Sequence, residues 1–355
     1  MNILVFLKLG DANALTHLIP LTLRENVHRI HIVRSRKVSI QGNKIVWHES
    51  GDFGPLISII RMFITGIRIL RKNRIDMIIT FNPVPYGTTA WILSRIFKRP
   101  ISMSLIGDDI NVHCRAWYAP FIHFVLRRCD RVTVPGLCYL EDVVNWGVNR
   151  ESVHILPHSI DLNRFRPFRP TDDRQYDFLF VGDLLPLKNV DIIIEAFAGS
   201  LTCYPSSRMA IIGDGRVRGD LERKAGGTAA GESIDFLGRK ENVEDYYNDA
   251  RVLVLASERE ALPLVLLEGM ACGCVPVATD RGVINEYVEN GRNGFLIREA
   301  DAGELKEVFL NLLEDRPLLR DVSKKAAGIR ERVGWEEAER TWSQIISSQG
   351  TKGKK

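Results

Sequence analysis

The amino-acid sequence predicts an α/β protein made of two doubly wound, Rossmann-like domains that face each other across a cleft. Short, continuous apolar runs recur along the chain, and segments with helical periodicity separate them. Since these runs do not alternate between polar and apolar residues, they are typical of strands covered on both faces, as in a parallel sheet. The length of 355 residues agrees with this prediction, because domains commonly hold about 150 residues each.

Ten apolar runs are predicted strands, five in each half of the chain. They cover residues 3–7, 29–33, 76–81, 101–105, 131–134, 178–181, 209–212, 234–237, 252–256 and 275–278. Helical periodicity is clearest over residues 56–71, 190–198 and 305–313. The alternation of strands and helices predicts the α/β class.

The stretch NRFRPFRPTDDRQYD (163–177) is rich in proline and charge, has no period and predicts the domain boundary. We expect a first domain over residues 1–165 and a second over 174–330. A C-terminal helix within 331–350 is expected to pack back toward the first domain. Ligands of such sheets bind outside the carboxyl ends of the strands.

Charge is distributed unevenly along the chain. Residues 1–170 hold 23 Lys and Arg against 12 Asp and Glu, a net charge of +11, whereas residues 171–355 carry −7. The basic half predicts an anionic partner such as phosphate groups, an acidic glycan or a membrane surface, and the alternative is an ordinary solvated surface. No nucleic acid is expected, because no binding motif accompanies the charge.

One predicted helix bears on the membrane hypothesis. Ser58, Arg61, Thr65, Arg68 and Lys72 fall on one face of an otherwise apolar segment. This helix either lies on anionic lipid or packs on the sheet with a solvated stripe.

Several function classes are disfavoured by missing motifs. The six cysteines form no CxxC pair and all eight histidines lie at or before His158, so no metal site is expected, and free thiols indicate a reducing cytosol. No GxGxxG follows the first strand, and neither a P-loop nor a Gly-x-Ser-x-Gly elbow occurs. The longest apolar stretches are shorter than the roughly 18 residues that a membrane span needs.

The segment SEREALPLVLLEGMACG (257–273) is the strongest candidate site. Glu260 would lie in a loop after a strand, Pro263 would begin a helix, and Glu268 would lie inside that helix. The helix start would offer free N–H groups to a diphosphate. The Glu268 carboxylate would accept hydrogen bonds from a vicinal diol, or it would only cap or form an ion pair locally.

This segment resembles the E-x7-E signature of retaining glycosyltransferases of family 4, which have the GT-B fold. Other segments resemble that family's motifs: VHILPHSIDLNRFRP (153–167), FVGDLLPLKNVDIIIEAF (180–197) with its lysine at Lys188, AIIGDG (210–215), IDFLGR (234–239) and ACGCVPVATDRGVINEYVENGRNGFLI (271–297).

The resemblance implies transfer of a sugar from a UDP- or GDP-sugar to a glycan or glycolipid acceptor, with retention and with no metal or other cofactor. It implies that Glu268 holds the ribose, that Glu260 touches the sugar and that Lys188 neutralises the leaving phosphates. The donor-binding residues that it implies are Gly182, Lys188, Gly213, Arg239, Glu260, Ala261, Leu262, Pro263, Leu264, Val265 and Glu268.

The resemblance assigns the acceptor to the first domain. Gly10, Gly107 and Asp109 are the residues that it places at the cleft, and Asp109 joins Glu260 and Lys188 as a catalytic candidate. His113 and His123 are further acid–base candidates, although a lone histidine is more often structural. The implied setting is cell-surface polysaccharide biosynthesis in the cytoplasm, with peripheral contact at the inner face of the membrane as a hypothesis.

One departure concerns the donor site. Asp183 follows Gly182 where the family commonly has an arginine. Since an acid near a diphosphate is unfavourable, we expect Arg216, Arg239 or Arg281 to offset it. The alternatives are a nucleotide-sugar epimerase of the same fold and a non-catalytic homologue that binds a sugar nucleotide or a partner.

Overall fold

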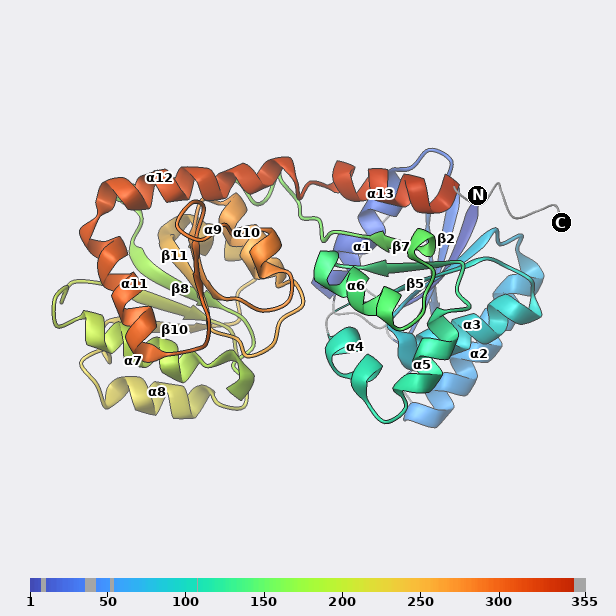
Figure 1. The fold of residues 1–355 in the computed structure, drawn as a ribbon, viewed down its shortest axis with the longest axis horizontal. Coiled ribbons are helices and arrows are strands. Elements are labelled where there is room, and N and C mark those ends of the chain that lie inside the picture. Colours follow the sequence, from blue (N-terminus) through green and yellow to red (C-terminus); the bar gives the residue numbers. More distant parts are fainter. Residues whose placement is uncertain (8–10, 36–42, 52–53, 107, 348–355) are drawn as a thin grey trace. The chain divides into compact units, whose positions relative to one another are not determined.

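The computed structural model describes residues 1–7, 11–35, 43–51, 54–106 and 108–347. The chain divides into two compact units, of which unit 1 contains Met1–Ser159 and continues from Trp335, and unit 2 contains Ile160–Gly334. Each unit is a parallel sheet with helices on both faces (Figure 1). This architecture confirms the predicted α/β class with two doubly wound, Rossmann-like domains.

In the described residues, unit 1 is built on a sheet of order β3-β2-β1-β4-β5-β6-β7 with parallel neighbours throughout. Its strands are β1 (Asn2–Phe6), β2 (Arg29–Arg34), β3 (Ile45–Glu49), β4 (Met77–Phe81), β5 (Ile101–Ser104), β6 (Arg131–Val134) and β7 (Val153–Ile155). Its helices are α1 (Asp11–Leu23), α2 (Pro55–Lys72), α3 (Thr88–Ile96), α4 (Asp108–Asn111), α5 (Ala119–Leu126), α6 (Leu137–Asn145) and α13 (Trp335–Ser347).

The last helix, α13, completes the core of unit 1. Trp342 and Ile345 on α13 are fully buried in the same cluster as Val5 of β1. The largely buried Arg24 also forms an ion pair with Glu339 of α13 at 2.8 Å. Unit 1 is therefore discontinuous in sequence, since its final helix follows the whole of unit 2.

Unit 2 repeats the architecture with a sheet of order β10-β9-β8-β11-β12-β13, again parallel throughout. Its strands are β8 (Tyr176–Val181), β9 (Met209–Ile212), β10 (Ile234–Gly238), β11 (Ala250–Leu255), β12 (Val275–Thr279) and β13 (Phe295–Ile297). Its helices are α7 (Val190–Ser200), α8 (Arg218–Gly226), α9 (Val243–Asp249), α10 (Leu264–Ala271), α11 (Ala302–Glu314) and α12 (Arg316–Ala327).

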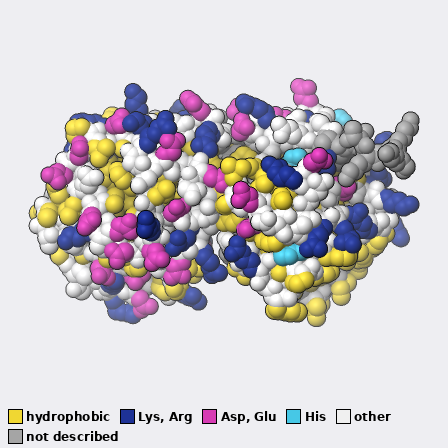
Figure 2. Space-filling model, viewed as in Figure 1, with side chains coloured by type: hydrophobic (Ala, Val, Ile, Leu, Met, Phe, Trp, Pro, Cys, Tyr) yellow, Lys and Arg dark blue, Asp and Glu magenta, His cyan; other side chains and the backbone are white. Residues whose placement is uncertain are grey.

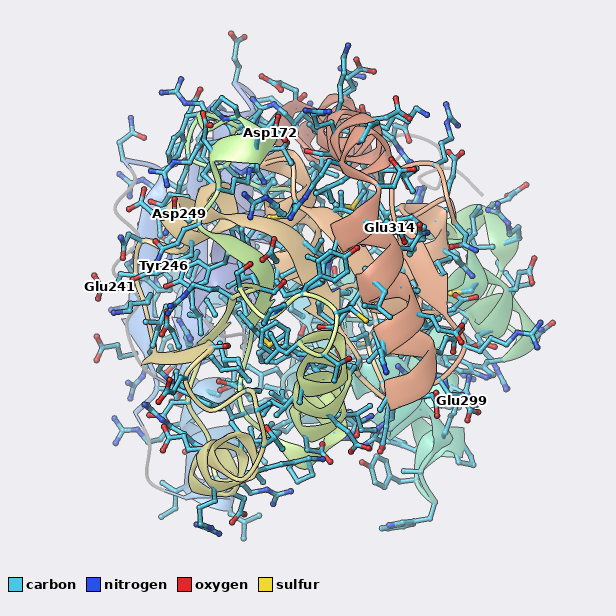
Figure 3. The ribbon with its side chains drawn as sticks, turned by 90° about the vertical axis from the view of Figure 1, so that its left-hand side faces the viewer. Asp172, Glu241, Tyr246, Asp249, Glu299 and Glu314 are labelled. Atoms are coloured by element: carbon cyan, nitrogen blue, oxygen red, sulfur yellow. The ribbon has the colours of Figure 1, made fainter. Side chains whose placement is uncertain are left out.

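The helices of unit 2 form two groups, which meet where α11 contacts α12. α7 contacts α8 and α11, whereas α10 contacts α9 and α12 (Figure 1). The surface of unit 2 carries many acids, as the charge count of this half predicts. Figure 3 labels four that are exposed, Asp172, Glu241, Glu299 and Glu314.

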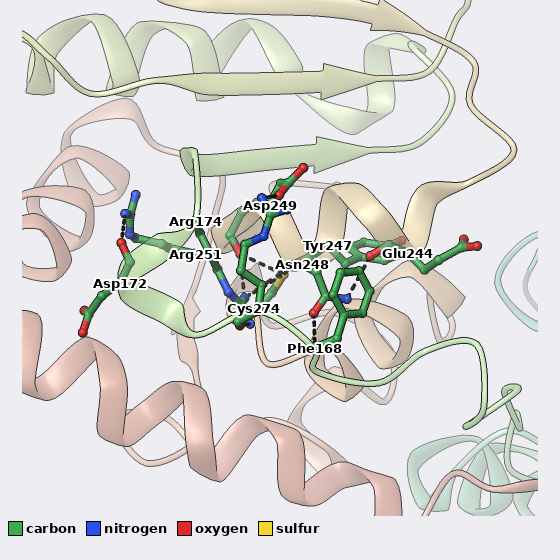
Figure 4. Close-up of polar contacts among 11 residues, drawn as sticks. Phe168, Asp172, Arg174, Glu244, Tyr247, Asn248, Asp249, Arg251 and Cys274 are labelled. Carbon is green, nitrogen blue, oxygen red and sulfur yellow. Dashed lines mark hydrogen bonds and ion pairs between the residues drawn. The ribbon is translucent and has the colours of Figure 1, made fainter.

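The segment 163–177 is not a linker, because it packs on unit 2. The Phe168 N–H donates to Asn248 Oδ1 at 2.8 Å, and the buried guanidinium of Arg174 donates to the carbonyls of Ala250 at 2.7 Å and Cys272 at 2.8 Å (Figure 4). The division between the units accordingly lies before Ile160, earlier than the boundary that the sequence predicted.

All ten predicted strands are present within a residue or two of their expected ends, and three further strands were missed. These three, β3, β7 and β13, lie at sheet edges. β3 is only half-buried, and β7 and β13 are three residues long, so none carries the continuous apolar run that marks a central strand.

Candidate donor site at the carboxyl edge of unit 2

Two loops of unit 2 meet where the strand order reverses. Because the sheet is parallel, all its strands end at one edge, and β8 and β11 are neighbours at its centre. From β8 the chain proceeds outward to β9 and β10, and from β11 it proceeds the other way to β12 and β13. Ligands of doubly wound sheets bind at this switch point, so the loops 182–189 and 256–263 mark the expected site.

These two loops are tied together by polar contacts. Lys188 donates a hydrogen bond to the carboxylate of Glu260, and both charged side chains are largely buried. Asn189 Nδ2 donates to the Ala256 carbonyl at 3.0 Å, and the Glu258 N–H donates to the Leu187 carbonyl at 2.9 Å. Two residues that lie 72 positions apart in sequence, Lys188 and Glu260, are thus brought to one point.

Helix α10 starts beside this ion pair. It runs over Leu264–Ala271, as the sequence predicts, but Pro263 is its extended N-cap and not its first helical residue. No side chain caps this helix start. Ala261, Leu262 and Pro263 are buried, while Leu264 and Val265 are partly exposed. An uncapped helix start favours a negative group by its free N–H donors and its dipole.

Glu268 lies one turn into α10 and has a specific partner. The Tyr247 hydroxyl donates to Glu268 Oε2 at 3.0 Å. Burial raises the pKa of Glu268 to about 7, although this hydrogen bond and the charge of Arg164 act in the opposite direction. The residue is therefore close to half-ionised at neutral pH. Tyr247, at 21 positions from Glu268, is a site residue that the sequence analysis missed.

Two glycines allow backbone to approach backbone at this edge. A Cβ on Gly213 would lie 1.8 Å from the Gly182 carbonyl oxygen, so the turns after β9 and β8 touch directly. A Cβ on Gly282, whose φ is +60°, would lie 2.3 Å from the carbonyl oxygens of Glu260 and Ala261. The sequence analysis missed Gly282, whose contact with the Glu260 loop only the structure reveals.

Asp183 and Arg239 form an exposed ion pair of 2.9 Å between the ends of β8 and β10. Arg239 is therefore the cation that offsets the negative charge of Asp183, as one of the three expected arginines. Pairs this exposed contribute little to stability, so the contact acts chiefly on the local charge.

In unit 1, Asp109 is buried and makes several hydrogen bonds. Asn82 Nδ2 lies 3.2 and 3.1 Å from its two carboxylate oxygens, and the Ile106 N–H donates to it at 2.9 Å. These contacts join the loops that follow β4 and β5. Gly10 and Gly107 lie outside the described residues.

The two histidine candidates of unit 1 have local partners. His113 Nδ1 lies 2.5 Å from the Tyr118 hydroxyl. His123 Nε2 lies 3.0 Å from the Cys114 carbonyl, and its ring stacks on Trp146. Both contacts suit structural histidines, which is the alternative that the sequence left open.

Among the described residues, no group of three or more His, Cys, Asp and Glu side chains is arranged to hold a metal ion. Metal-free chemistry stays a prediction. None of the described helices is long and apolar enough to cross a membrane.

Comparisons with known proteins agree with this geometry. A model described as "Glycosyl transferase 4-like domain" matches residues 22–158, and one described as "Glycosyl transferases group 1" matches residues 162–328. The protein is a glycosyltransferase of the GT-B type. This glycosyltransferase is 25% identical over 290 residues to an uncharacterized glycosyltransferase of Methanocaldococcus jannaschii, covering 80% of this chain and 78% of the relative.

Further relatives carry specific names. The glycosyltransferase is 21% identical over 269 residues to N-acetyl-alpha-D-glucosaminyl L-malate synthase of Bacillus anthracis, covering 73% of this chain and 70% of that one. The crystal structure of Anabaena HepE in complex with UDP and glucose aligns with a TM-score of 0.81 and 18% identity, covering 98% of this chain and all of HepE. At that identity the structural match supports the fold alone.

Proposed function

We propose that this glycosyltransferase is a retaining enzyme of family 4 that moves a sugar from a UDP- or GDP-sugar to a glycan or glycolipid acceptor. The observation that carries the proposal is the Lys188–Glu260 pair at the β8–β11 switch point, beside the uncapped start of α10. The HepE structure, solved with UDP and glucose, supports a nucleotide-sugar donor. We propose that the enzyme works in the cytoplasm, in the biosynthesis of a polysaccharide for the cell surface.

The proposal gives each residue of the site a role. The diphosphate lies at the start of α10, where the N–H groups of Leu264 and Val265 and the Lys188 ammonium offset the charge that grows on the leaving phosphate. Glu260 contacts the sugar, and Glu268 accepts hydrogen bonds from the ribose.

In this proposal, the outer part of the donor site is lined by two features. One is the close-packed turns at Gly182 and Gly213, and the other is the ion pair of Asp183 with Arg239. Unit 1 binds the acceptor. Asp109 holds the loops there and is a positioning residue. The chemistry as proposed needs neither a metal nor an organic cofactor.

The first test is a thermal-shift panel of UDP- and GDP-sugars, since a ligand that binds the folded state raises its melting temperature. Glu268→Ala is expected to abolish the shift. Lys188→Ala is expected to lower turnover by about 100-fold or more, because it removes a cation from the leaving group.

Lys224→Ala is the matched control, because Lys224 also forms an ion pair within unit 2, with Glu195 at 3.1 Å, but on the α8 surface. Normal sugar transfer by both site variants would refute the assignment of the site. Release of an altered nucleotide sugar without any acceptor would instead identify an epimerase.

A further inference from the structure

Unit 1 exposes an unusual amount of apolar side chain on three neighbouring helices. α2 contacts α3. Trp91 of α3 and Phe124 of α5 pack edge to face, and their ring centroids are 6.0 Å apart. Nine of the thirteen large hydrophobic side chains that are exposed in the described residues lie on these helices or, for Trp117, two residues before α5: Leu56, Ile57, Ile60, Ile64, Ile92, Ile96, Trp117, Phe121 and Phe124. We call these nine the α2–α3–α5 surface.

Several of these residues expose most of their surface to solvent. Trp117 is 92% exposed, Leu56 76% and Ile96 59%. Figure 2 shows yellow side chains gathered along the lower right margin of the molecule, with dark blue ones beside them. A contiguous apolar patch of this kind marks an interaction site, because solvent alone would disfavour it.

The charged side chains on these three helices have one sign. α2, α3 and α5 contain no Asp or Glu, while Arg61, Arg68, Arg71 and Lys72 are exposed on α2. The sequence left two interpretations of this helix, and its outward face proves to mix arginine with isoleucine. The exposed Arg61, Arg68 and Lys72 fit the solvated stripe of one interpretation, and the exposed isoleucines beside them are what the other interpretation needs.

A basic pocket adjoins the patch at the end of α3. Its volume is about 330 Å³, and its lining residues are Ser94, Arg95, Lys98, Arg99, Pro100 and Asp130. The one acid among them, Asp130, accepts the Ile101 N–H at 3.0 Å. Arg95 also donates a hydrogen bond to the Arg128 carbonyl, and the Arg128 guanidinium lies 3.6 Å from the centre of the Phe124 ring. A pocket with three cations suits a phosphate group.

We propose that the α2–α3–α5 surface docks on an anionic phospholipid bilayer, with a headgroup phosphate in the pocket of Arg95, Lys98 and Arg99. The isoleucines and aromatic rings enter the interface while the cations meet the headgroups, as in amphipathic membrane-surface helices. A second copy of this surface is a poor partner, because cations would face cations. The inference rests on the proposed function in that a lipid-linked acceptor would be held at this bilayer.

The test is co-sedimentation of the full chain with vesicles of phosphatidylcholine alone and of an equal mixture of phosphatidylcholine and phosphatidylglycerol. Binding is expected only to the mixture and is expected to weaken with salt. The double variant Ile57→Ser, Ile60→Ser is expected to lose at least tenfold in binding. The double variant Lys98→Gln, Arg99→Gln is expected to lose about fivefold per removed cation.

Leu137→Ser is the matched control, because Leu137 is 57% exposed, close to the 58% of Ile60, but lies on α6 outside this surface. Competition by soluble glycerol phosphate that removes the protein from vesicles completely would show a site for free phosphate and overturn bilayer docking. Equal binding of all variants, equal binding to both vesicle types, or a soluble dimer that the isoleucine substitutions dissociate would overturn it as well.

Nucleotide-sugar thermal shifts are measured on the same variants, which keeps the two proposals separable. Shifts that persist without vesicle binding would refute only the docking surface. Vesicle binding without any shift would refute only the donor site.

Discussion

At the scale of single residues, the role proposed for Glu268 predicts that donor binding depends on pH. Its pKa is raised to about 7 by burial, so the protonated form predominates in the unliganded protein only below about pH 7. Ribose hydroxyls would instead favour the carboxylate, which accepts hydrogen bonds. The affinity for a UDP-sugar is therefore expected to be constant above about pH 7 and to fall roughly tenfold per pH unit below it.

Isothermal titration with a UDP-sugar between pH 5.5 and about 8 measures this dependence, since the diphosphate of the intact sugar nucleotide does not titrate there. Glu268→Gln should bind more weakly, and its affinity should not change with pH. A pH-dependent affinity that survives in this variant would point to another group.

A second residue-scale prediction concerns His17 and His158, whose rings lie 4.9 Å apart in the interior of unit 1 with no hydrogen-bond partner on any ring nitrogen. Burial lowers the pKa of His158 to about 4, and burial with the neighbouring His158 lowers the pKa of His17. Because both pKa values are depressed by folding, unit 1 should lose stability as the pH falls below 6.5, by roughly 3 kcal/mol for His158 at pH 4.

Urea unfolding from pH 7 to 4 measures this loss. His158→Phe should reduce the slope of stability against pH, whereas substitution of the exposed His28, which lies outside the core, should leave it unchanged. Identical slopes for wild type and His158→Phe would contradict the assignment.

At the scale of elements, the loop 256–263 depends on the turn that contains Gly282. Gly282→Ala combines a left-handed φ with a collision against two carbonyl oxygens of that loop, so it should displace Glu260 and lower donor affinity at least tenfold. Gly291→Ala is the control, because its φ is +74° but no atom lies within 4 Å of the added Cβ. That control should cost only about 1 kcal/mol of stability and leave donor affinity intact.

The elements also show how far sequence reasoning reaches. α10 was predicted to within one residue, with Pro263 as its start where the structure has Leu264, because an apolar run follows a proline after a strand. Edge strands such as β3 were missed because half-buried strands lack an apolar run. The Tyr247–Glu268 bond and the approach of Gly282 to Glu260 depend on tertiary packing, and no local pattern records them. The outward isoleucines of α2 escaped notice because periodicity locates a polar face without showing which apolar residues lie beside it.

At the scale of the whole molecule, unit 1 should depend on a helix that follows unit 2. Trp342→Ala is expected to destabilise unit 1 by roughly 3 kcal/mol or more, because it opens a cavity under α13. Hydrogen exchange is expected to rise across β1 and α1 and to stay unchanged in unit 2. Arg340→Ala, at an exposed position of the same helix, should have little effect. Faster exchange in both units of the Trp342→Ala variant would contradict the expectation that unit 1 unfolds without unit 2.

This discontinuity has a consequence for biogenesis. When the ribosome has made Gly334, unit 2 is complete in sequence, but the nascent unit 1 still lacks Trp342 and Ile345 for its interior. Nascent domains commonly mature in the order of their synthesis. Here unit 2 can reach its native form first, whereas unit 1 lacks part of the apolar core beside β1 until α13 has been synthesised.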